Sequence, residues 1–281
     1  MTIRILSPHC ARTDFIEYQS RSLAKFFLDE YELIILNDAK DPKTRKAISL
    51  ECNRLDVMCY ETPDDLIHSS GPVACAAVLQ WAWDDLVIKH YTDDVVIFLD
   101  SDMFMIREFS AKQFLGDAVI AGVPQHRGVI TYFWNGIMLF DVPRMPHPDR
   151  LMLYCGIVRG QNVDVGGMMY YYFAENSEVI VKAVPHTSHI HSSNSNLHVL
   201  PTAVRDKYQE DYRIEICAGS FLHYGSGTNW QFTAGSYEFL MGGDCMPPKT
   251  EFVFWFLEEL LSSRVAMPEV KYIFSELGSG I

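Results

Sequence analysis

One segment constrains the fold more than any other. Residues 95–99 read Val-Val-Ile-Phe-Leu and are followed at once by Asp100-Ser101-Asp102. A short apolar run bounded by polar residues is typical of a strand that is buried on both faces. Such strands lie at the centre of parallel sheets that helices cover on both sides. We therefore predict an α/β fold with residues 95–99 near the middle of its sheet.

The segments before this strand alternate between strand and helix patterns. The predicted strands comprise residues 4–7, 31–36 and 56–60, and the predicted helices comprise residues 15–30, 43–52 and 71–87. This alternation favours a Rossmann-like, doubly wound arrangement with a mixed, mainly parallel sheet flanked by helices. Later patterns predict strands at 118–123, 136–141 and 178–184, a loop at 186–198 and a terminal helix at 251–265. With no internal repeat and no linker, a single domain over residues 1–281 is expected.

Composition narrows the classes of partner. The chain is 48% hydrophobic and 21% charged, which excludes a disordered protein. Its 36 acidic and 23 basic side chains give a formal charge of −13. This balance argues against nucleic acid as a partner, because phosphate neutralisation needs a basic surface. An anionic substrate would instead need a bound cation or oriented backbone donors.

The cysteines and the apolar segments bear on the compartment. Seven cysteines, an odd number without a Cys-x-x-Cys pair, favour a reduced, cytoplasmic environment. The first residues carry no secretory pattern, and no run of about 18 apolar residues predicts a membrane-spanning helix. We expect the apolar run at 252–257 to pack on the core, with peripheral membrane contact as the alternative.

The acidic pair after the central strand is the main functional signal. In an extended chain, residues two apart point to the same side, so Asp100 and Asp102 can present two carboxylates together. They follow a central strand at its carboxyl end, where open α/β sheets bind ligands. Two hard oxygen donors suit Mg²⁺ or Mn²⁺. The structural alternative is a solvated acidic turn.

Three later segments carry polar residues beside glycine. They are Asn135-Gly136 after an aromatic run, Asp164 before Gly166-Gly167, and His223 before Gly225. Glycine allows a close backbone approach, and neutral imidazole is a common metal ligand. Each segment also has a structural interpretation: an ordinary turn, a helix cap and a structural histidine. The histidines at 186, 189, 191 and 198 are interpreted as loop residues, because no cysteine pairs or regular spacing indicate zinc.

Taken in order, these segments resemble glycosyltransferases of the GT-A fold that carry an Asp-x-Asp motif. The segment Phe221-Leu222-His223 with the following glycines is loosely similar to family 8, the glycogenin and lipopolysaccharide galactosyltransferase group. The resemblance covers residues 3–231, with Asn229 near the position of that family's lysine. It implies a GT-A fold whose nucleotide-binding half is residues 1–105 and whose acceptor-binding half, with the C-terminal helix, is residues 106–281.

The resemblance also implies a role for each candidate residue. Asp100, Asp102 and His223 would hold the metal, which is Mn²⁺ or Mg²⁺. Contacts with the nucleotide are implied for Ser7, Pro8, Asn37, Asp38, Asp100, Ser101, Asp102, Gly225, Ser226 and Asn229. Contacts with the sugar or the acceptor are implied for Asn135, Gly136, Gly166, Gly167 and Trp230. Asp164 is the catalytic candidate, for acceptor activation or sugar positioning.

The expected function is therefore metal-dependent transfer of a sugar from a nucleotide diphosphate, with UDP as the expected nucleotide, to a hydroxyl of a glycan or other acceptor. One alternative is an Asp-x-Asp phosphatase or a nucleotidyltransferase. Phosphatases of the haloacid dehalogenase type continue into a small Gly-Thr or Gly-Val turn, whereas this chain has Met103-Phe104. Another alternative is a non-catalytic protein that binds nucleotide sugars or glycans.

Overall fold

A computed structural model gives the fold, and it describes residues 1–66, 71–187, 190, 195–209, 212–225 and 246–269. The central sheet has seven strands in the order β10 (Val181–Ala183), β6 (Ile120–Arg127), β7 (Ile130–Asp141), β4 (Val95–Leu99), β1 (Ile3–His9), β2 (Tyr31–Asn37) and β3 (Met58–Glu61). Within this sheet β7 runs antiparallel to both of its neighbours, and the other pairings are parallel. The predicted mixed, mainly parallel sheet is confirmed, with β4 at its centre.

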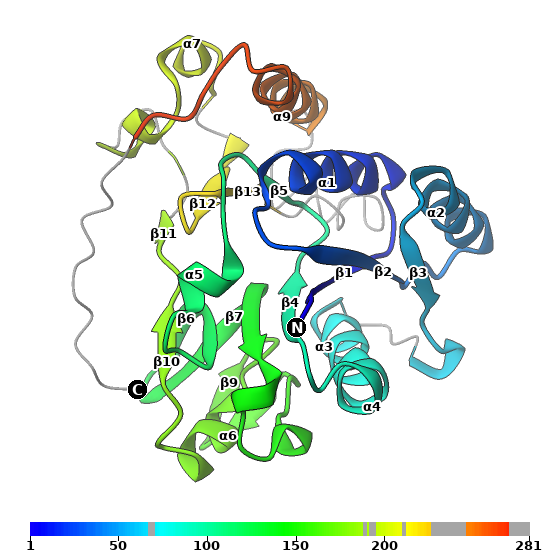
Figure 1. The fold of residues 1–281 in the computed structure, drawn as a ribbon, viewed down its shortest axis with the longest axis vertical. Coiled ribbons are helices and arrows are strands. Elements are labelled where there is room, and N and C mark those ends of the chain that lie inside the picture. Colours follow the sequence, from blue (N-terminus) through cyan, green and yellow to red (C-terminus); the bar gives the residue numbers. More distant parts are fainter. Residues whose placement is uncertain (67–70, 188–189, 191–194, 210–211, 226–245, 270–281) are drawn as a thin grey trace.

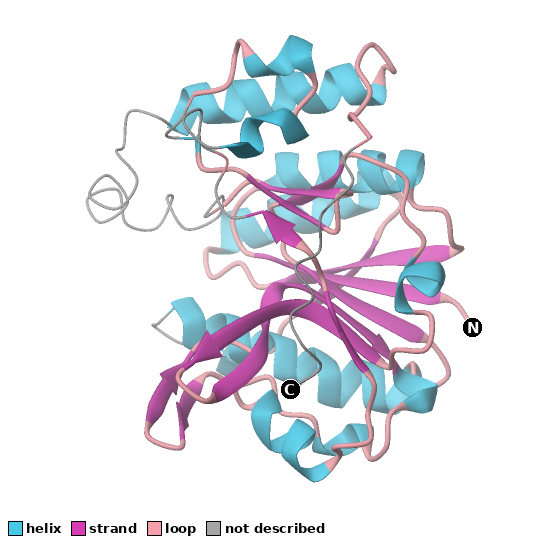
Figure 2. Ribbon diagram, turned by 90° about the vertical axis from the view of Figure 1, so that its left-hand side faces the viewer, coloured by secondary structure: helices cyan, strands magenta, loops and turns pink. Residues whose placement is uncertain are grey.

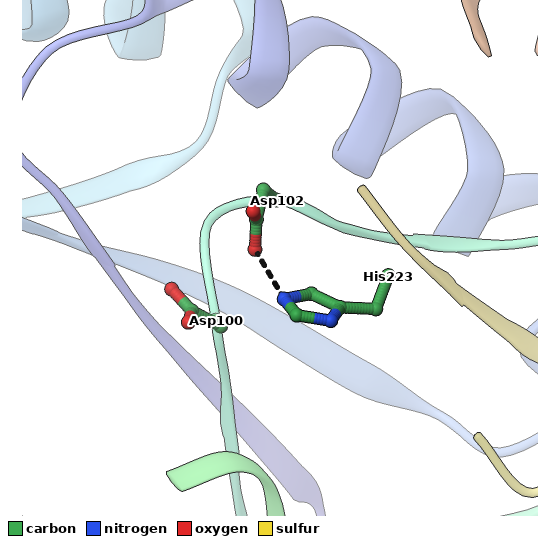
Figure 3. Close-up of side chains that lie close together, drawn as sticks. All are labelled: Asp100, Asp102 and His223. Carbon is green, nitrogen blue, oxygen red and sulfur yellow. Dashed lines mark ion pairs between the residues drawn. The ribbon is translucent and has the colours of Figure 1, made fainter. Parts of the chain in front are cut away.

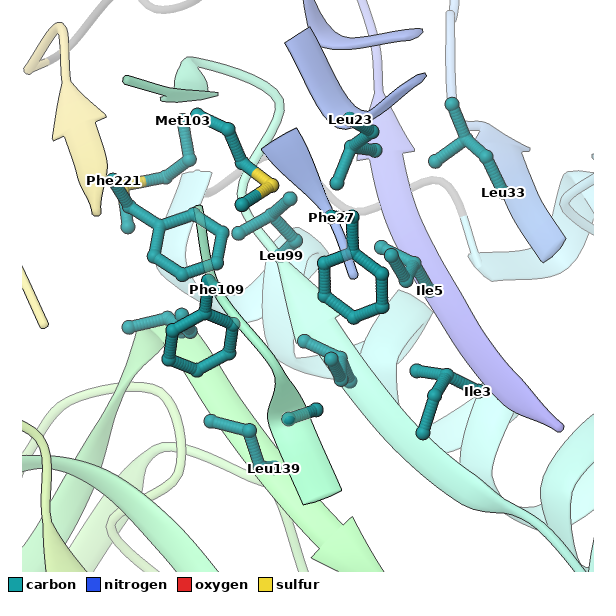
Figure 4. Close-up of a cluster of buried hydrophobic side chains, with 14 of the residues drawn as sticks. Ile3, Ile5, Leu23, Phe27, Leu33, Leu99, Met103, Phe109, Leu139 and Phe221 are labelled. Carbon is teal, nitrogen blue, oxygen red and sulfur yellow. The ribbon is translucent and has the colours of Figure 1, made fainter. Parts of the chain in front are cut away.

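Helices cover both faces of this sheet (Figures 1 and 2). One face packs on α1 (Thr13–Phe26) and α2 (Pro42–Leu55). The other packs on α6 (Met169–Glu175) and on α3 (Gly71–Trp81), which continues without a break into η2 (Ala82–Val87) and α4 (Ile88–His90). Side chains along each strand alternate between the two cores: Ile5 belongs to the first and Leu6 to the second. Figure 4 shows the first core, where Phe27 lies beside Ile5 of β1.

A second, antiparallel sheet of four strands adjoins the central one. Its order is β11 (His186–Thr187), β12 (Glu215–Cys217), β13 (Phe221–His223) and β5 (Met103–Met105). A third core joins this sheet and α1 to α9 (Met246–Leu261). Phe252, Val253 and Phe256 of α9 are buried there, so the apolar run at 252–257 packs on the core as expected.

The remaining elements complete the second half of the chain and the connections. They are η1 (Asp64–Leu66), α5 (Ala111–Leu115), η3 (Val142–Arg144), η4 (Pro148–Arg150), a hairpin of β8 (Gly156–Val158) and β9 (Gln161–Val163), η5 (Ser195–Val199) and α7 (Thr202–Arg205). Within the described ranges, no helix has the length and apolarity needed to cross a membrane.

Several element boundaries differ from the sequence prediction. The first helix ends at Phe26 rather than near residue 30, because the extended Phe27 pairs with Phe109 beside the core. The strands predicted at 118–123 and 136–141 are longer, since β6 and β7 form one hairpin around Gly128. His186 and Thr187, predicted in a loop, form β11 at the edge of the second sheet.

Candidate metal centre

The turn between β4 and β5 carries both acidic residues. Asp100 directly follows β4, and Asp102 directly precedes β5. The Asp100 N–H donates to the carbonyl oxygen of Gly136 on β7 at 2.9 Å, and the Met103 N–H donates to the Asp100 carbonyl oxygen at 3.1 Å. Gln19 of α1 donates to the carbonyl oxygens of Asp100 and Met103 at 3.0 and 3.2 Å. Hydrogen bonds with β7 and α1 thus hold the turn in place.

Pairing of β13 with β5 brings His223 to this turn. His223 lies opposite Met103 in the antiparallel register, and the Tyr224 N–H donates to the Asp102 carbonyl oxygen at 2.9 Å. The His223 Nε2 atom is 3.3 Å from the Asp102 Oδ1 atom, as drawn in Figure 3. One potential ligand atom from each of Asp100, Asp102 and His223 lies within 4.8 Å of the other two. The three predicted metal ligands therefore come together.

The charges at this group are strongly coupled. Burial, and then the charge of Asp102, raise the pKa of Asp100 to about 7. Burial lowers the pKa of His223, but Asp102 and Glu215 outweigh it and raise the value to about 10. In the metal-free protein a proton on His223 thus offsets part of the negative charge. A divalent cation can take over this role, and two carboxylates with one imidazole form a donor set that fits Mn²⁺ or Mg²⁺.

Asn135, another predicted residue, contacts Cys75 in the first turns of α3. The Asn135 amide donates to the Cys75 Sγ atom at 3.6 Å. Burial raises the pKa of the Cys75 thiol, and the charges of Asp100, Asp38 and Asp164 raise it further. Asp164 is exposed, and one of its carboxylate oxygens accepts the Val165 N–H at 2.8 Å. The Asn135 amide is thus in direct contact with this thiol, whereas the three acids influence its pKa through their charges.

Other predicted residues lie near the strand ends, and three of them, Asn37, Asp38 and Ser101, have hydrogen-bond partners within the protein. The Asn37 side chain is fully buried and donates to the Arg45 carbonyl oxygen and the Ser49 hydroxyl of α2, at 2.8 and 3.1 Å. Ser7 is fully buried within β1, and the neighbouring Pro8 is half-buried. Asp38 is half-buried and accepts a hydrogen bond from the Thr62 hydroxyl at 3.1 Å. Ser101 is buried and its N–H donates to the Asp100 carboxylate at 2.8 Å.

The predicted glycines make close contacts within the protein. A Cβ at Gly136 would overlap the indole of Trp134, and a Cβ at Gly167 would overlap Val163. Gly166 has a φ of +85°, and its missing Cβ leaves room for the Phe133 carbonyl oxygen. The close approach that these glycines allow is therefore to neighbouring protein atoms.

The loop after His223 is described only as far as Gly225, and Ser226, Asn229 and Trp230 lie outside the described residues. Gly225 has a φ of +81°, and its carbonyl oxygen accepts a hydrogen bond at 3.1 Å from Lys249 of α9. The Lys249 side chain is fully buried, and its ammonium lies 4.3 Å from the centre of the Tyr224 ring.

Several residues at the site were missed by sequence reasoning. Glu215 contacts His223, Trp134 packs edge-on against the His223 ring with centroids 4.8 Å apart, and Lys249 reaches the loop from α9. His186, interpreted as a loop histidine, contacts Glu215. Their places depend on pairing between distant segments, so no local pattern indicates them.

Comparisons with known proteins give similar solved structures only. No protein-family model matches the chain, and no curated protein matches it significantly. One similar structure is mouse xyloside xylosyltransferase 1, with 12% identity over 65% of this chain and 85% of that chain and a TM-score of 0.40. A second is the bifunctional glycosyltransferase WbbM, with 14% identity over 51% of this chain and 32% of that chain and a TM-score of 0.34. A third is the galactosyltransferase LgtC with donor and acceptor sugar analogues, with 13% identity over 54% of this chain and 62% of that chain and a TM-score of 0.31.

By name these three proteins are glycosyltransferases, the class that the sequence resembles. All three TM-scores are at or below 0.40 and the identities at or below 14%, so the likeness supports no conclusion about the function of this chain. The functional interpretation therefore rests on the geometry of the site itself.

Proposed function

We propose that the protein is a metal-dependent glycosyltransferase. It would move a sugar from a nucleotide diphosphate, with UDP as the nucleotide, to a hydroxyl of a glycan or other acceptor. The observation that carries the proposal is the group of Asp100, Asp102 and His223, whose ligand atoms lie within 4.8 Å of one another. This group follows the central strand at its carboxyl end, where open α/β sheets bind ligands.

The chemistry explains why such a site needs a cation. When a sugar leaves its nucleotide diphosphate, negative charge develops on the diphosphate. A bound Mn²⁺ or Mg²⁺ would stabilise that charge. The chain as a whole carries a formal charge of −13, and at this site the buried Lys249 ammonium donates to the carbonyl oxygen of Gly225, two residues after His223.

Asp164 is the residue that we assign to the acceptor side. Its carboxylate is exposed, and its charge, like that of Asp100, raises the pKa of the Cys75 thiol. An exposed carboxylate near the donor site can accept a proton from an attacking hydroxyl or orient a sugar. In this proposal residues 1–105 form the nucleotide-binding half and residues 106–281 form the acceptor-binding half.

Donor turnover with added Mn²⁺ tests the proposal. A panel of nucleotide sugars is incubated with the protein, and hydrolysis or transfer is followed with and without EDTA. We expect EDTA and Asp102→Ala each to reduce turnover about 100-fold or more, because the stabilisation of the leaving group is lost. Asp93→Ala, at the exposed opposite end of β4, is the matched control and should retain turnover.

Three outcomes would contradict the proposal. Full activity in EDTA together with full activity of Asp102→Ala would remove the metal from the mechanism. Turnover of a sugar phosphate without any nucleotide would favour a phosphatase. Tight binding of UDP without turnover of any donor would favour a binding protein.

A further inference from the structure

The His223 ring is held from both of its nitrogen atoms. Its Nε2 atom faces Asp102 at 3.3 Å, and its Nδ1 atom lies 2.8 Å from the Glu215 Oε2 atom. The other carboxylate oxygen of Glu215 lies 3.4 Å from the His186 Nε2 atom. These contacts form a continuous row of side chains that ends at the candidate metal group: His186, Glu215, His223 and Asp102.

This row runs from the surface into the interior. The exposed fraction of the side chain falls from 28% at His186 to 12% at Glu215, 10% at His223 and 4% at Asp102. A buried carboxylate is costly unless charged or polar groups compensate it. At Glu215 the two imidazole rings provide that compensation, so the carboxylate is held at a fixed place between them.

Backbone pairing sets the spacing of the row. Glu215 on β12 lies directly opposite His223 on β13. His186 and Thr187 pair with the next two residues along β12, opposite Cys217 and Ile216. The Thr187 hydroxyl accepts the Ile216 N–H at 2.9 Å and donates to the Ile216 carbonyl oxygen at 3.2 Å, which fixes β11 on β12. The contact between Glu215 and His223 is therefore built into the sheet register.

We propose that Glu215 is a positioning residue that orients His223 for metal binding, and that His186 holds Glu215 in place. A carboxylate that accepts the Nδ1–H fixes the tautomer of the ring and leaves the Nε2 lone pair to face the metal. The inference rests on the proposed metal site. It goes beyond it by assigning a role to two residues outside the Asp100, Asp102 and His223 group.

Mn²⁺ binding to the full-length protein tests this assignment. Affinity is measured by the electron paramagnetic resonance signal of free Mn²⁺, for wild type, Glu215→Ala, Glu215→Gln and His186→Asn. Loss of such a supporting carboxylate is expected to weaken Mn²⁺ binding roughly 10- to 100-fold in Glu215→Ala. Glu215→Gln should lose less Mn²⁺ affinity, because its amide oxygen still accepts the Nδ1–H of His223. His186→Asn should lose the least Mn²⁺ affinity of the three variants.

A matched control and a spectroscopic signal separate positioning from simple stabilisation. Glu51→Gln changes a carboxylate that is 17% exposed and bonded to Arg54 in α2, and it should bind Mn²⁺ as wild type does. In Mg²⁺-loaded wild type, the His223 Nδ1 proton should give a downfield NMR signal protected from exchange. That signal should persist in Glu215→Gln and disappear in Glu215→Ala.

Two results would overturn the inference, and they are distinguishable. If wild type binds Mn²⁺ and a folded Glu215→Ala binds it equally well, the positioning role is wrong while the metal site stands. A lower melting temperature with unchanged Mn²⁺ affinity leads to the same conclusion. If wild type itself does not bind Mn²⁺, both the inference and the proposed metal-dependent function fail.

Discussion

His9, the last residue of β1, makes the stability of this protein depend on pH. Its side chain is fully buried, and its Nε2 atom lies 3.3 Å from the amide oxygen of Gln19. The same Gln19 amide donates to the turn that carries Asp100. Burial lowers the pKa of His9 from its ordinary 6.5 to about 4. Between these two values the unfolded chain binds a proton at this position and the folded protein does not.

The sign and the size of the effect follow from this difference. Because the unfolded state binds more protons, the free energy of unfolding rises with pH between about 4 and 6.5. Over this whole pH range His9 contributes about 3 kcal/mol to the change in the free energy of unfolding, since each unit of pKa difference corresponds to about 1.4 kcal/mol. Between pH 7.5 and pH 4.5 the expected loss is about 2.5 kcal/mol. The raised pKa of Asp100 acts in the opposite direction, but it is common to wild type and variant and cancels in their difference.

Urea unfolding at several pH values in EDTA measures the contribution. His9→Gln keeps a donor near Gln19 and cannot be protonated, so its stability should fall about 2.5 kcal/mol less than that of wild type as the pH is lowered from 7.5 to 4.5. His126→Gln, at an exposed position, is the control and should follow the wild-type pH profile. The reasoning is refuted if wild type and His9→Gln lose the same stability over this range.

Three further substitutions test the packing around the site. Gln19→Met removes the donor to the Asp100 carbonyl oxygen and should lower the free energy of unfolding, measured in urea, by about 1–3 kcal/mol. An unchanged free energy would show that this hydrogen bond does not stabilise the turn. Gly136→Ala should displace the indole of Trp134, at a cost of about 1–3 kcal/mol, and shift the tryptophan fluorescence, whereas Gly71→Ala, in open space, should do neither. Trp83→Phe should cost about 1–3 kcal/mol in thermal unfolding, because the 2.8 Å hydrogen bond from the buried indole to the half-buried Pro148 carbonyl oxygen is lost; full retention of stability would show that this bond is dispensable.

Local patterns were sufficient for the centre of the fold and for the metal group. The apolar run at 95–99 and the acidic pair after it are adjacent in sequence, so the strand and the candidate ligands could be predicted together. His223 was found because it ends an apolar segment before glycines. Pattern alone could not reveal which way a side chain points: Asn37 ends a strand, as a ligand residue would, yet its amide is bonded to α2.

Longer-range features could not be predicted because they depend on strand register. Glu215 and His186 reach His223 only through the pairing of β11, β12 and β13, and nothing near either residue indicates that pairing. Gly136 was predicted to make room for a ligand, whereas the adjacent space is filled by Trp134. Lys249 lies before residue 251, where the terminal helix was predicted to begin, whereas α9 begins at Met246 and carries Lys249 to Gly225.

The candidate metal group lies at the seam between two sheets. Asp100 directly follows β4 of the central sheet, whereas Asp102 directly precedes β5 and His223 ends β13, both in the smaller sheet. A cation bound here would cross-link the two sheets. Its affinity would therefore depend on how the two sheets are aligned. Because α9 packs on the smaller sheet and reaches Gly225 through Lys249, a change in the packing of α9 would be transmitted to the ligands without touching any of them.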